Sequence, residues 1–466
     1  MVKIPSRLVV FFLSLLFFLI LITFFTYNQN HIALPYDSAL SSVTYDLETP
    51  DPTVEPLTTL PLKPPLSSII ANNANHIKKR NNIGLAKARA AIRRAIQTRN
   101  FTSSKKEIFV PRGCIYRNAY AFHQSHIEML KRFKVWTYKE GEPPLVHDGP
   151  MASIYGIDGH FMTEVENRSS PFWAGHPEEA HVFMLPISVV NIVKYLYHPL
   201  TTFSRGQFKR VTTDYTNIIA RKYPYFNRSR GADHFLASCH DWAPDISRGT
   251  NGKVLFKNLI KVICNANTSK GFNPAKDVSI PEMSLLGFEL TSSGQDPNHR
   301  SILAFFAGGV HGSIGKILLK HWKDKDEEVK VYEYLPKDLD YHDLMRSSKF
   351  CLCPSGYEVA SPRLVEAINT GCVPVIVSDH YQLPFSDVLD WSKFSLHIPS
   401  ERIPEIKTIL KNVTHARYLK LQKRVMQVQR HFMLNHPAKP FDVFHMILHS
   451  IWLRRLNIKL PSIDIQ

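Results

Sequence analysis

Short apolar runs alternate with amphipathic stretches through the first large part of the chain. The runs have the length of strands and are bounded by polar residues, at 133–138, 180–188, 233–238 and 259–264. Between them, residues 123–133 and 188–197 repeat their apolar positions with the period of a helix. Strands that alternate with helices are typical of a parallel sheet with right-handed crossovers. The pattern therefore predicts an α/β domain over residues 106–295.

The alternation restarts after a polar segment at 290–301. Strands are predicted at 302–307, 328–335, 349–353 and 373–377, and helices at 313–322, 340–348 and 362–368. Two such stretches predict two Rossmann-like domains that face each other, the second spanning residues 296–430. Residues 431–466 contain a last helical stretch at 441–455. We expect it to pack back across both domains, and the alternative is an ordinary amphipathic core helix.

The N-terminus carries an uncharged apolar run at 8–27. About 20 residues at about 1.5 Å each span the hydrocarbon core of a bilayer, which is about 30 Å thick. Lys3 and Arg7 precede the run and the next Lys or Arg is Lys63, so the positive-inside rule leaves residues 1–7 in the cytoplasm. A cleaved signal peptide is the alternative, but its apolar core is shorter. The pattern favours a transmembrane signal anchor with the bulk of the chain in the lumen.

Residues 28–105 are predicted to form a luminal stem. Their first part is rich in Pro, Ser, Thr and Asn and cannot bury enough apolar surface to fold by itself. Residues 83–99 have one apolar helical face, with Lys and Arg over much of the remaining surface. Behind a luminal anchor, we expect this helix to act as a spacer or to self-associate within the stem.

Composition and charge narrow the class of partner. The chain has 466 residues, of which 44% are hydrophobic and 21% charged, as expected for a mostly globular protein of two large domains. Its net charge of +17 indicates an anionic partner, such as a membrane surface, an acidic polymer or nucleic acid. A luminal location excludes nucleic acid.

The segment after the apolar run carries features of a secreted environment. Five glycosylation sequons begin at Asn100, Asn167, Asn227, Asn267 and Asn412. An oxidising lumen permits disulfides among the six cysteines, but their connectivity cannot be read from the sequence. The spacing of Cys351 and Cys353 is not that of a zinc site.

The segment CPSGYEVASPRLVEAINTGCVPVIV, at 353–377, places a loop between a buried strand and a short helix. Ser361 is a good N-cap and Pro362 suits the first helical position, while Gly371 fits the C-cap. Ligands bind beyond the carboxyl ends of parallel strands, and a helix N-terminus attracts anions. The loop with Ser355 and Gly356 is therefore a candidate phosphate site. The alternative is that it only connects the strand to the crossover helix of an ordinary βαβ unit.

Arg363 and Glu366 lie three residues apart in this helix and share one face. The arginine can pair with a diphosphate, and the carboxylate one turn deeper can accept both hydroxyls of a ribose. A surface Arg–Glu pair on a capped crossover helix is the alternative.

A second glycine-bearing loop follows the strand at 302–307, in FFAGGVHGSIGK. Its spacing is neither a Walker A loop nor G-x-G-x-x-G, so the motif is weak by itself. Two such loops in one domain strengthen each other, which makes Gly308 and Gly309 candidate donor-binding residues. Lys316 can add charge against phosphate, and a solvated lysine is the alternative.

Two D-x-D pairs match a pattern of metal-dependent sugar transferases, Asp324 with Asp326 and Asp338 with Asp340. The first pair lies in the charged segment HWKDKDEEVK rather than at the end of an apolar strand. We interpret it as a solvated charge run, and expect that no metal or cofactor is required.

Two His–Asp pairs follow strands of the first domain, His240 with Asp241 and His147 with Asp148. Either pair can deprotonate an acceptor hydroxyl, because general-base catalysis needs a His or a carboxylate within hydrogen-bond reach. The alternative for each pair is that the aspartate caps a loop.

These motifs resemble the plant exostosin-type glycosyltransferases of family 47. The resemblance covers roughly residues 80–460 and rests on SKFCLCPSGYEVASPRLVEAINTGCVPVIVSDHYQLPFSDVLDW, KEGEPPLVHDGP, ADHFLASCHDW, LAFFAGGVHG and FDVFHMILHSIWLRRLN. It implies a GT-B fold, a type II Golgi membrane protein and inverting transfer from a UDP-sugar to a cell-wall polysaccharide, without a metal. Met151 stands where many relatives have Cys, which removes one disulfide partner.

With this resemblance, we interpret the candidate residues as two sites. The second domain is expected to bind the UDP-sugar through Ser355, Gly356, Arg363, Glu366, Gly308, Gly309 and Lys316. The first domain is expected to hold the acceptor, with Asp241 or His240 as the base and His147 and Asp148 in an acceptor-side loop. The branch that contains a xylogalacturonan xylosyltransferase is similar, which fits a basic protein acting on an acidic pectin.

Two other functions remain open at this point. One is a catalytically silent polysaccharide-binding subunit of a synthase complex; homo-oligomers, and hetero-oligomers with other Golgi transferases, stay open for the enzyme as well. The other is a glycoside hydrolase, which needs two carboxylates that flank one sugar bond.

Overall fold

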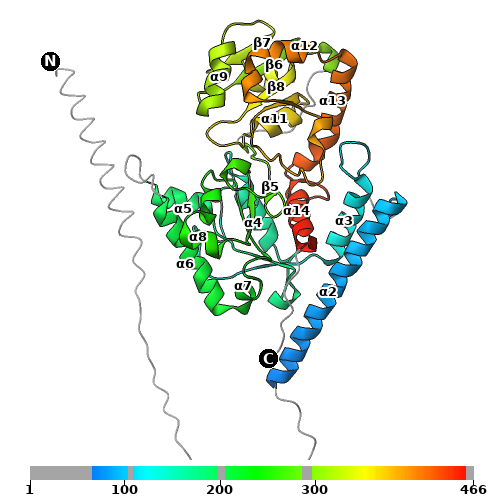
Figure 1. Ribbon diagram of the computed structural model, residues 1–466, viewed down its shortest axis with the longest axis vertical. Coiled ribbons are helices and arrows are strands. Elements are labelled where there is room, and N and C mark those ends of the chain that lie inside the picture. The colour runs from blue at the N-terminus through cyan, green and yellow to red at the C-terminus, as the bar shows by residue number, and fades with distance from the viewer. Residues whose placement is uncertain (1–65, 103–108, 198–204, 286–295, 458–466) are drawn as a thin grey trace, which may run out of the picture. The chain divides into compact units, whose positions relative to one another are not determined.

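The computed structural model describes residues 66–102, 109–197, 205–285 and 296–457 (Figure 1). The expected cytoplasmic tail, the anchor at 8–27 and the first part of the stem lie outside these ranges. Within them, no helix is both long enough and apolar enough to cross a membrane. Residues 65–466 form one compact unit that contains two sheets.

The first sheet has five parallel strands in sequential order, β1 to β5. They are β1 (Val135–Thr137), β2 (Val182–Met184), β3 (His234–Ser238), β4 (Ile260–Ile263) and β5 (Val278–Ser279). The helices between them are α4 (Ile157–Glu166), α5 (Val189–Leu196), α6 (Gly206–Lys222), α7 (Pro224–Ser229) and α8 (Thr250–Leu255). Strands β2, β3 and β4 are buried at every position, as expected for a parallel sheet covered on both faces.

The second sheet also has five parallel strands, in the order β10-β9-β8-β6-β7. They are β6 (Ile302–Ala307), β7 (Val329–Tyr332), β8 (Ser348–Pro354), β9 (Val373–Val377) and β10 (Leu396–Ile398). Its helices are α9 (Gly312–Trp322), α10 (Tyr341–Arg346), α11 (Arg363–Asn369), α12 (Ile406–Lys411) and α13 (His415–Val428). The two parallel-sheet α/β halves that the sequence predicts are therefore confirmed.

The order of the second sheet reverses at β6. The chain passes from β6 outward to β7 and then returns past β6 to β8. Such a reversal is the point at which open α/β sheets bind ligands, beyond the carboxyl ends of the strands. The loops after β6 and β8 are the two glycine-bearing loops of the sequence.

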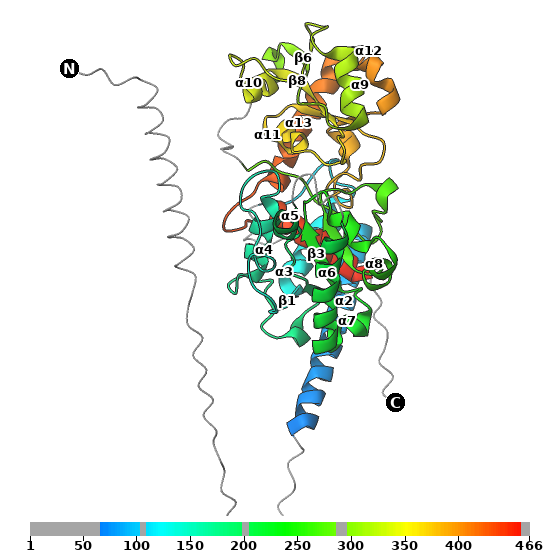
Figure 2. The same cartoon turned by 90° about the vertical axis from the view of Figure 1, so that its left-hand side faces the viewer.

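The helix expected in the stem packs against the first half instead. Helix α2 (Leu66–Thr98) lies along α3 (Ala119–Arg132), as Figures 1 and 2 both show. Its apolar residues Leu85, Ala88 and Ala95 are buried. The Arg89 guanidinium donates a hydrogen bond to the Leu456 carbonyl at 2.8 Å. The apolar stripe is therefore covered by this chain's own fold, and the predicted stem boundary at residue 105 lies beyond the start of the packed structure.

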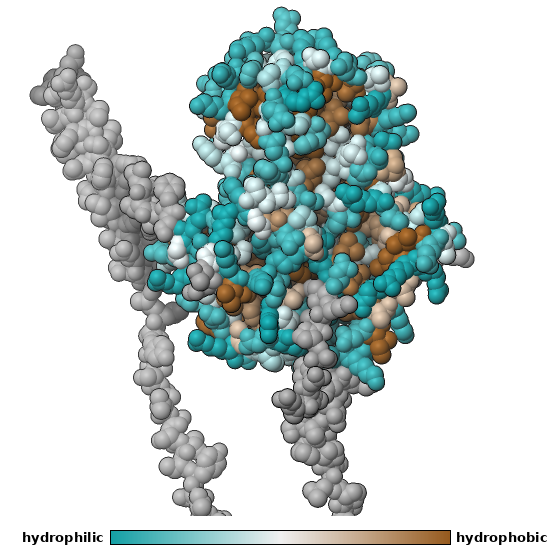
Figure 3. All heavy atoms as spheres, in the orientation of Figure 1, coloured by the Kyte–Doolittle hydropathy of each residue, from teal (hydrophilic) through white to brown (hydrophobic). Residues whose placement is uncertain are grey.

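The C-terminal helix α14 (Val443–Asn457) is buried on nearly all sides rather than amphipathic. It contacts α3, β4 and β5 of the first half. Arg455 donates to the His181 carbonyl at 2.6 Å, and Arg454 pairs at 2.8 Å with Asp387, which follows β9. The chain thus returns from the second half to complete the core of the first. The face in Figure 3 is mostly hydrophilic with scattered apolar patches, since the strands lie inside.

Two disulfides each join neighbouring strands. Cys239 and Cys264 link the ends of β3 and β4, and Cys351 in β8 pairs with Cys372 just before β9. Cys114 is exposed and Cys353 is buried, both as free thiols.

The sequons differ in their exposure. Asn100, Asn167, Asn227 and Asn412 are exposed. Asn267 is only 7% exposed, and its side-chain oxygen accepts hydrogen bonds from the Ser269 N–H and hydroxyl. Asn267 is therefore the least accessible of the five sequons in the folded chain.

Candidate active site

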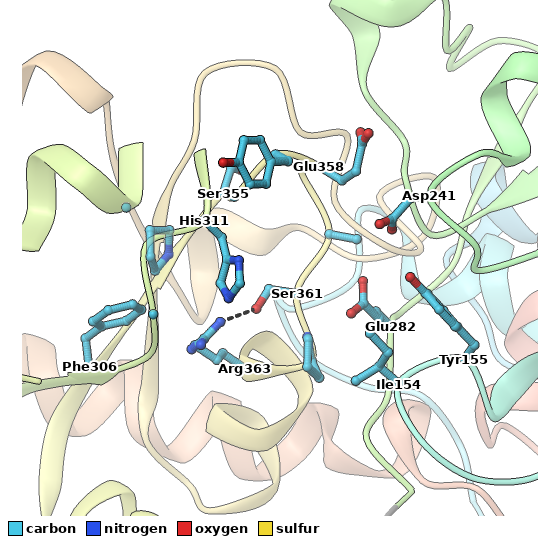
Figure 4. A pocket seen from close by; sticks show the side chains of 17 residues that line it. Ile154, Tyr155, Asp241, Glu282, Phe306, His311, Ser355, Glu358, Ser361 and Arg363 are labelled. Carbon is cyan, nitrogen blue, oxygen red and sulfur yellow. Dashed lines mark hydrogen bonds between the residues drawn. The ribbon is translucent and has the colours of Figure 1, made fainter. Parts of the chain in front are cut away.

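A cavity of about 390 Å³ lies where the loops after β6 and β8 meet residues of the first half (Figure 4). One wall includes Phe306, Gly309 and Arg363, and the other includes Tyr155, Asp241 and Glu282. The structure therefore brings together candidate residues from both halves of the sequence in one hollow.

Arg363 is fixed at the first turn of α11. Its Nε donates to the Ala307 carbonyl at 3.2 Å and its Nη1 donates to the Ser361 hydroxyl at 3.1 Å. The guanidinium carbon stands 5.0 Å from the centre of the Phe306 ring. These contacts hold a planar cation at the cavity wall, in a form suited to a diphosphate.

The two glycine-bearing loops touch each other. Gly312 has φ +76, and a Cβ atom there would lie 2.5 Å from the carbonyl of Gly356. A side chain at position 312 would therefore separate the loops. Ser355 is buried, and its hydroxyl hydrogen-bonds to that of Ser378 at 2.7 Å, so it anchors the second loop at the cavity wall.

The start of α11 differs in detail from the expectation. The helix begins at Arg363 with Pro362 as its N-cap, and no side chain caps it. The Ser361 hydroxyl accepts from Arg363 rather than capping the helix. The helix has only 7 residues, and the cation at this end of the cavity is the Arg363 guanidinium.

Glu366 and Lys316 lie away from the cavity wall. Glu366 is one turn behind Arg363, where it accepts a hydrogen bond from the Tyr341 hydroxyl at 2.8 Å. Lys316 is exposed on α9. Neither residue is among those that line the cavity. The expectation that Lys316 faces phosphate is not supported by its position, and Glu366 supports the site from behind in this structure.

Asp241 lies at the opposite wall, just after β3. Burial raises the pKa of its carboxyl, the charge of Glu358 raises it further, and an interaction with the Tyr155 hydroxyl opposes both. The buried Asp158 holds this strand end in place, because it accepts from the Cys239 N–H at 2.7 Å. A carboxylate with a raised pKa in a cavity is suited to general-base catalysis.

His240 is adjacent in sequence but is engaged elsewhere. Its Nδ1 accepts a hydrogen bond from the Trp242 N–H at 3.0 Å, and it is not among the cavity-lining residues. Burial lowers the pKa of His240 to about 4. Of the two alternatives for a base at this strand end, the geometry favours Asp241.

His147 and Asp148 fix a loop and do not reach the cavity. His147 pairs with Glu166 at 2.8 Å, which raises the histidine pKa. Asp148 is exposed and accepts a hydrogen bond from Asn191 at 3.3 Å. The role expected for this pair at the acceptor is therefore not supported. The following loop, however, delivers Tyr155 to the cavity.

Polar contacts of Glu358, Lys270 and Asn265 join the two cavity walls. Glu358, in the loop after β8, pairs with Lys270 at 2.9 Å and also accepts from Asn265. The same asparagine donates to the Asp241 carbonyl at 3.2 Å. The loop that carries Ser355 is thus tied to the strand end that carries Asp241.

One aspartate of each D-x-D pair has a structural partner. Asp326 pairs with Lys407 at 2.6 Å, and Asp340 caps α10 by accepting from the Asp343 N–H at 2.8 Å. Neither carboxylate lines the cavity. This agrees with the interpretation of the first pair as part of a charged surface segment.

Sequence reasoning missed Glu282, Glu358 and Tyr155. Glu282 follows the two-residue strand β5, so the rule that functional residues follow parallel strands would have found it if that strand had been recognised. Glu358 lies within the loop already singled out. Tyr155 lies in a loop without periodicity, and no sequence signal marks it.

Comparison with known proteins agrees with this geometry. Residues 129–413 match the Exostosin GT47 domain. A probable glycosyltransferase of Arabidopsis thaliana is 51% identical over 381 residues, which cover 81% of this chain and 72% of the relative. A probable beta-1,4-xylosyltransferase of the same species is 27% identical over 61% of this chain and 72% of its own length. A probable glucuronosyltransferase of Oryza sativa subsp. japonica is 26% identical over 69% of this chain and 81% of its own. The domain match covers more than half of the sequence, and the chain belongs to the exostosin GT47 family of glycosyltransferases.

Proposed function

We propose that the protein transfers a sugar from a UDP-sugar to a plant cell-wall polysaccharide, with inversion and without a metal ion. The observation that carries the proposal is that Arg363 and Asp241 line one cavity from opposite halves of the fold. A fixed cation and a half-buried carboxylate are the two charges that such a transfer needs.

In this scheme, the acceptor hydroxyl oxygen attacks the anomeric carbon of the sugar as the bond from that carbon to the UDP oxygen breaks. The hydroxyl proton passes to the Asp241 carboxylate, and the negative charge that develops on UDP is stabilised by the Arg363 guanidinium. Charge fixed in place before the reaction stabilises the transition state more than mobile water does. Glu366 accepts a hydrogen bond from the Tyr341 hydroxyl behind the site.

The choice of acceptor rests on relatives and on charge. Relatives are named for xylosyl and glucuronosyl transfer, and the sequence resembles the branch with a xylogalacturonan xylosyltransferase. A net charge of +17 fits an acidic pectin. We place the protein in the Golgi membrane as a single-pass type II protein, with residues 8–27 as its anchor.

The first test is UDP release by the purified full-length protein in detergent, across a panel of UDP-sugars and wall oligosaccharides, with and without EDTA. We expect turnover with one donor and no effect of EDTA. Arg363→Ala should abolish UDP binding by calorimetry, while Lys316→Ala, which removes a cation outside the cavity, should leave it unchanged.

Three other results of this test would contradict the proposed function. A folded protein that binds UDP and polysaccharide but turns over no donor would favour the silent subunit. Activity that requires a divalent ion would contradict metal independence. Release of sugar from a polysaccharide without any UDP-sugar would favour a hydrolase.

A further inference from the structure

Glu282 is a buried carboxyl that the scheme above does not use. It is 6% exposed and lines the cavity. Figure 4 shows the carboxyl directed into the space between Asp241 and Ser361. Within the described ranges, no hydrogen bond or ion pair to Glu282 is found, and its surroundings act on it only through burial and charge. Buried polar groups in folded proteins are almost always hydrogen-bonded, so this carboxyl is placed to bind a ligand.

Burial and the surrounding charges favour the protonated form of the Glu282 carboxyl. Burial raises its pKa to about 8, with a further increase from Asp241 and Glu366 and a decrease from Arg363. Burial raises the pKa of the nearby Tyr155 and Tyr381 hydroxyls, with smaller increases from neighbouring carboxyls that include Glu282. A protonated carboxyl donates one hydrogen bond and accepts another. A sugar hydroxyl can likewise donate one hydrogen bond and accept another, so the two groups are complementary.

The cavity contains few cations for a second anionic group. Arg363 is the only Arg or Lys among the described residues that line it. In the proposed function, its guanidinium already pairs with the diphosphate. Three carboxyls line the same space, those of Asp241, Glu282 and Glu358, and Lys270 neutralises only the last. A uronic acid would place a carboxylate beside that of Asp241, which is ionised when it acts as the base, and no second Arg or Lys among the described lining residues would neutralise it. Like charges at such a site raise the free energy of binding.

We infer that the transferred sugar is an uncharged pentose or hexose and that Glu282 binds one of its hydroxyl groups. The inference rests on the proposed function, since it assumes a UDP-sugar held at Arg363. It names the class of donor sugar, and it makes Glu282 the residue that recognises the sugar rather than the nucleotide.

The test is calorimetry of the full-length protein at pH 7 with UDP, UDP-xylose, UDP-galactose, UDP-glucuronate and UDP-galacturonate. We expect at least one neutral UDP-sugar to bind about tenfold more tightly than UDP, as one well-made hydrogen bond allows. Glu282→Ala should lose this gain, and Glu282→Gln, which also donates and accepts, should keep part of it. All three proteins should bind UDP equally, which shows that the variants fold.

The pH dependence adds a readout that a purely structural role would not change. Above pH 8 the wild type should lose its extra affinity for the neutral UDP-sugar over UDP, because Glu282 ionises. Glu282→Gln should keep its own extra affinity at the same pH. Tighter binding of a uronate donor than of UDP, or a full gain in Glu282→Ala, would overturn the inference alone. A wild type that does not bind UDP would overturn the proposed function, and this inference with it.

Discussion

Arg363 and Gly308 share a space that holds only one side chain, because a Cβ atom on Gly308 would overlap Nη2 of Arg363. Gly308→Ala should therefore displace the guanidinium while leaving the fold intact, since the overlapping group is the far end of a flexible side chain. We expect UDP affinity to fall about tenfold or more, in line with the loss of charge-assisted hydrogen bonds. Calorimetry measures the affinity, and thermal melting measures the fold.

The next residue is the matched control. A Cβ atom on Gly309 would lie 3.6 Å from Nε2 of His311, an ordinary contact distance. Because Gly309 lines the cavity but lies clear of Arg363, Gly309→Ala should lower UDP affinity less than Gly308→Ala does. Equal losses in the two variants would mean that the loop tolerates no side chain at all, and the specific link to Arg363 would be refuted.

Asp241→Asn should keep UDP binding and lose transfer, because the amide cannot take the acceptor proton. The base works only when ionised, so activity falls as the pH drops through the pKa of Asp241. That pKa is raised by burial and then by Glu358, and the acidic limb of kcat/KM should lie above the range of an exposed aspartate. Glu358→Gln should shift this limb to lower pH. Full activity in Asp241→Asn would remove it as the base.

The packing of α2 predicts a stability effect far from the cavity. Leu85 is 2% exposed, and Leu85→Ala should lower the free energy of unfolding by about 2–5 kcal/mol, as for other large-to-small changes in a core. Ile83 is 47% exposed on the same helix, so Ile83→Ala should cost far less. Urea denaturation separates the two. Equal small effects would indicate that α2 is a detached stem helix after all.

Glycosylation tests the exposure of the sequons and the luminal location together. When the protein is made in a plant secretory pathway, Asn→Gln changes at 100, 167, 227 and 412 should each remove a mobility shift where the site is used. Asn267→Gln should remove none, because that side chain is enclosed. Absence of every shift on glycosidase treatment would count against a luminal chain, and a glycan at Asn267 would mean that modification precedes folding.

The parallel sheets could be predicted because their strands are buried on both faces. Continuous apolar runs such as Ile302–Ala307 and Val373–Val377 appear in the sequence without ambiguity. Short strands at sheet edges carry too few residues for a pattern, and β5 was missed for this reason. An amphipathic stripe such as that of α2 shows that a helix face is covered, but not by what.

The site was predictable to the extent that it follows strand ends in sequence. The positions after β3, β6 and β8 supply Asp241, Gly309 and the loop before Arg363, all of which line the cavity. Residue type alone did not separate the useful His–Asp pair from the pair at 147 and 148, because both occur after strands. Their partners, Glu166 and Asn191, are distant enough in sequence that only the fold brings them close.

The burial of α14 also affects how the protein is made. Ribosomes deliver a chain from its N-terminus, and domains tend to fold as they emerge. The first half of this chain lacks a core helix until residues 443–457 have been translated, because α14 fills it. The apolar surface of the first sheet that α14 covers therefore stays exposed while the second half is synthesised. The first half therefore completes its core only after the second half has been synthesised, and a premature stop near residue 440 would remove the helix that completes it.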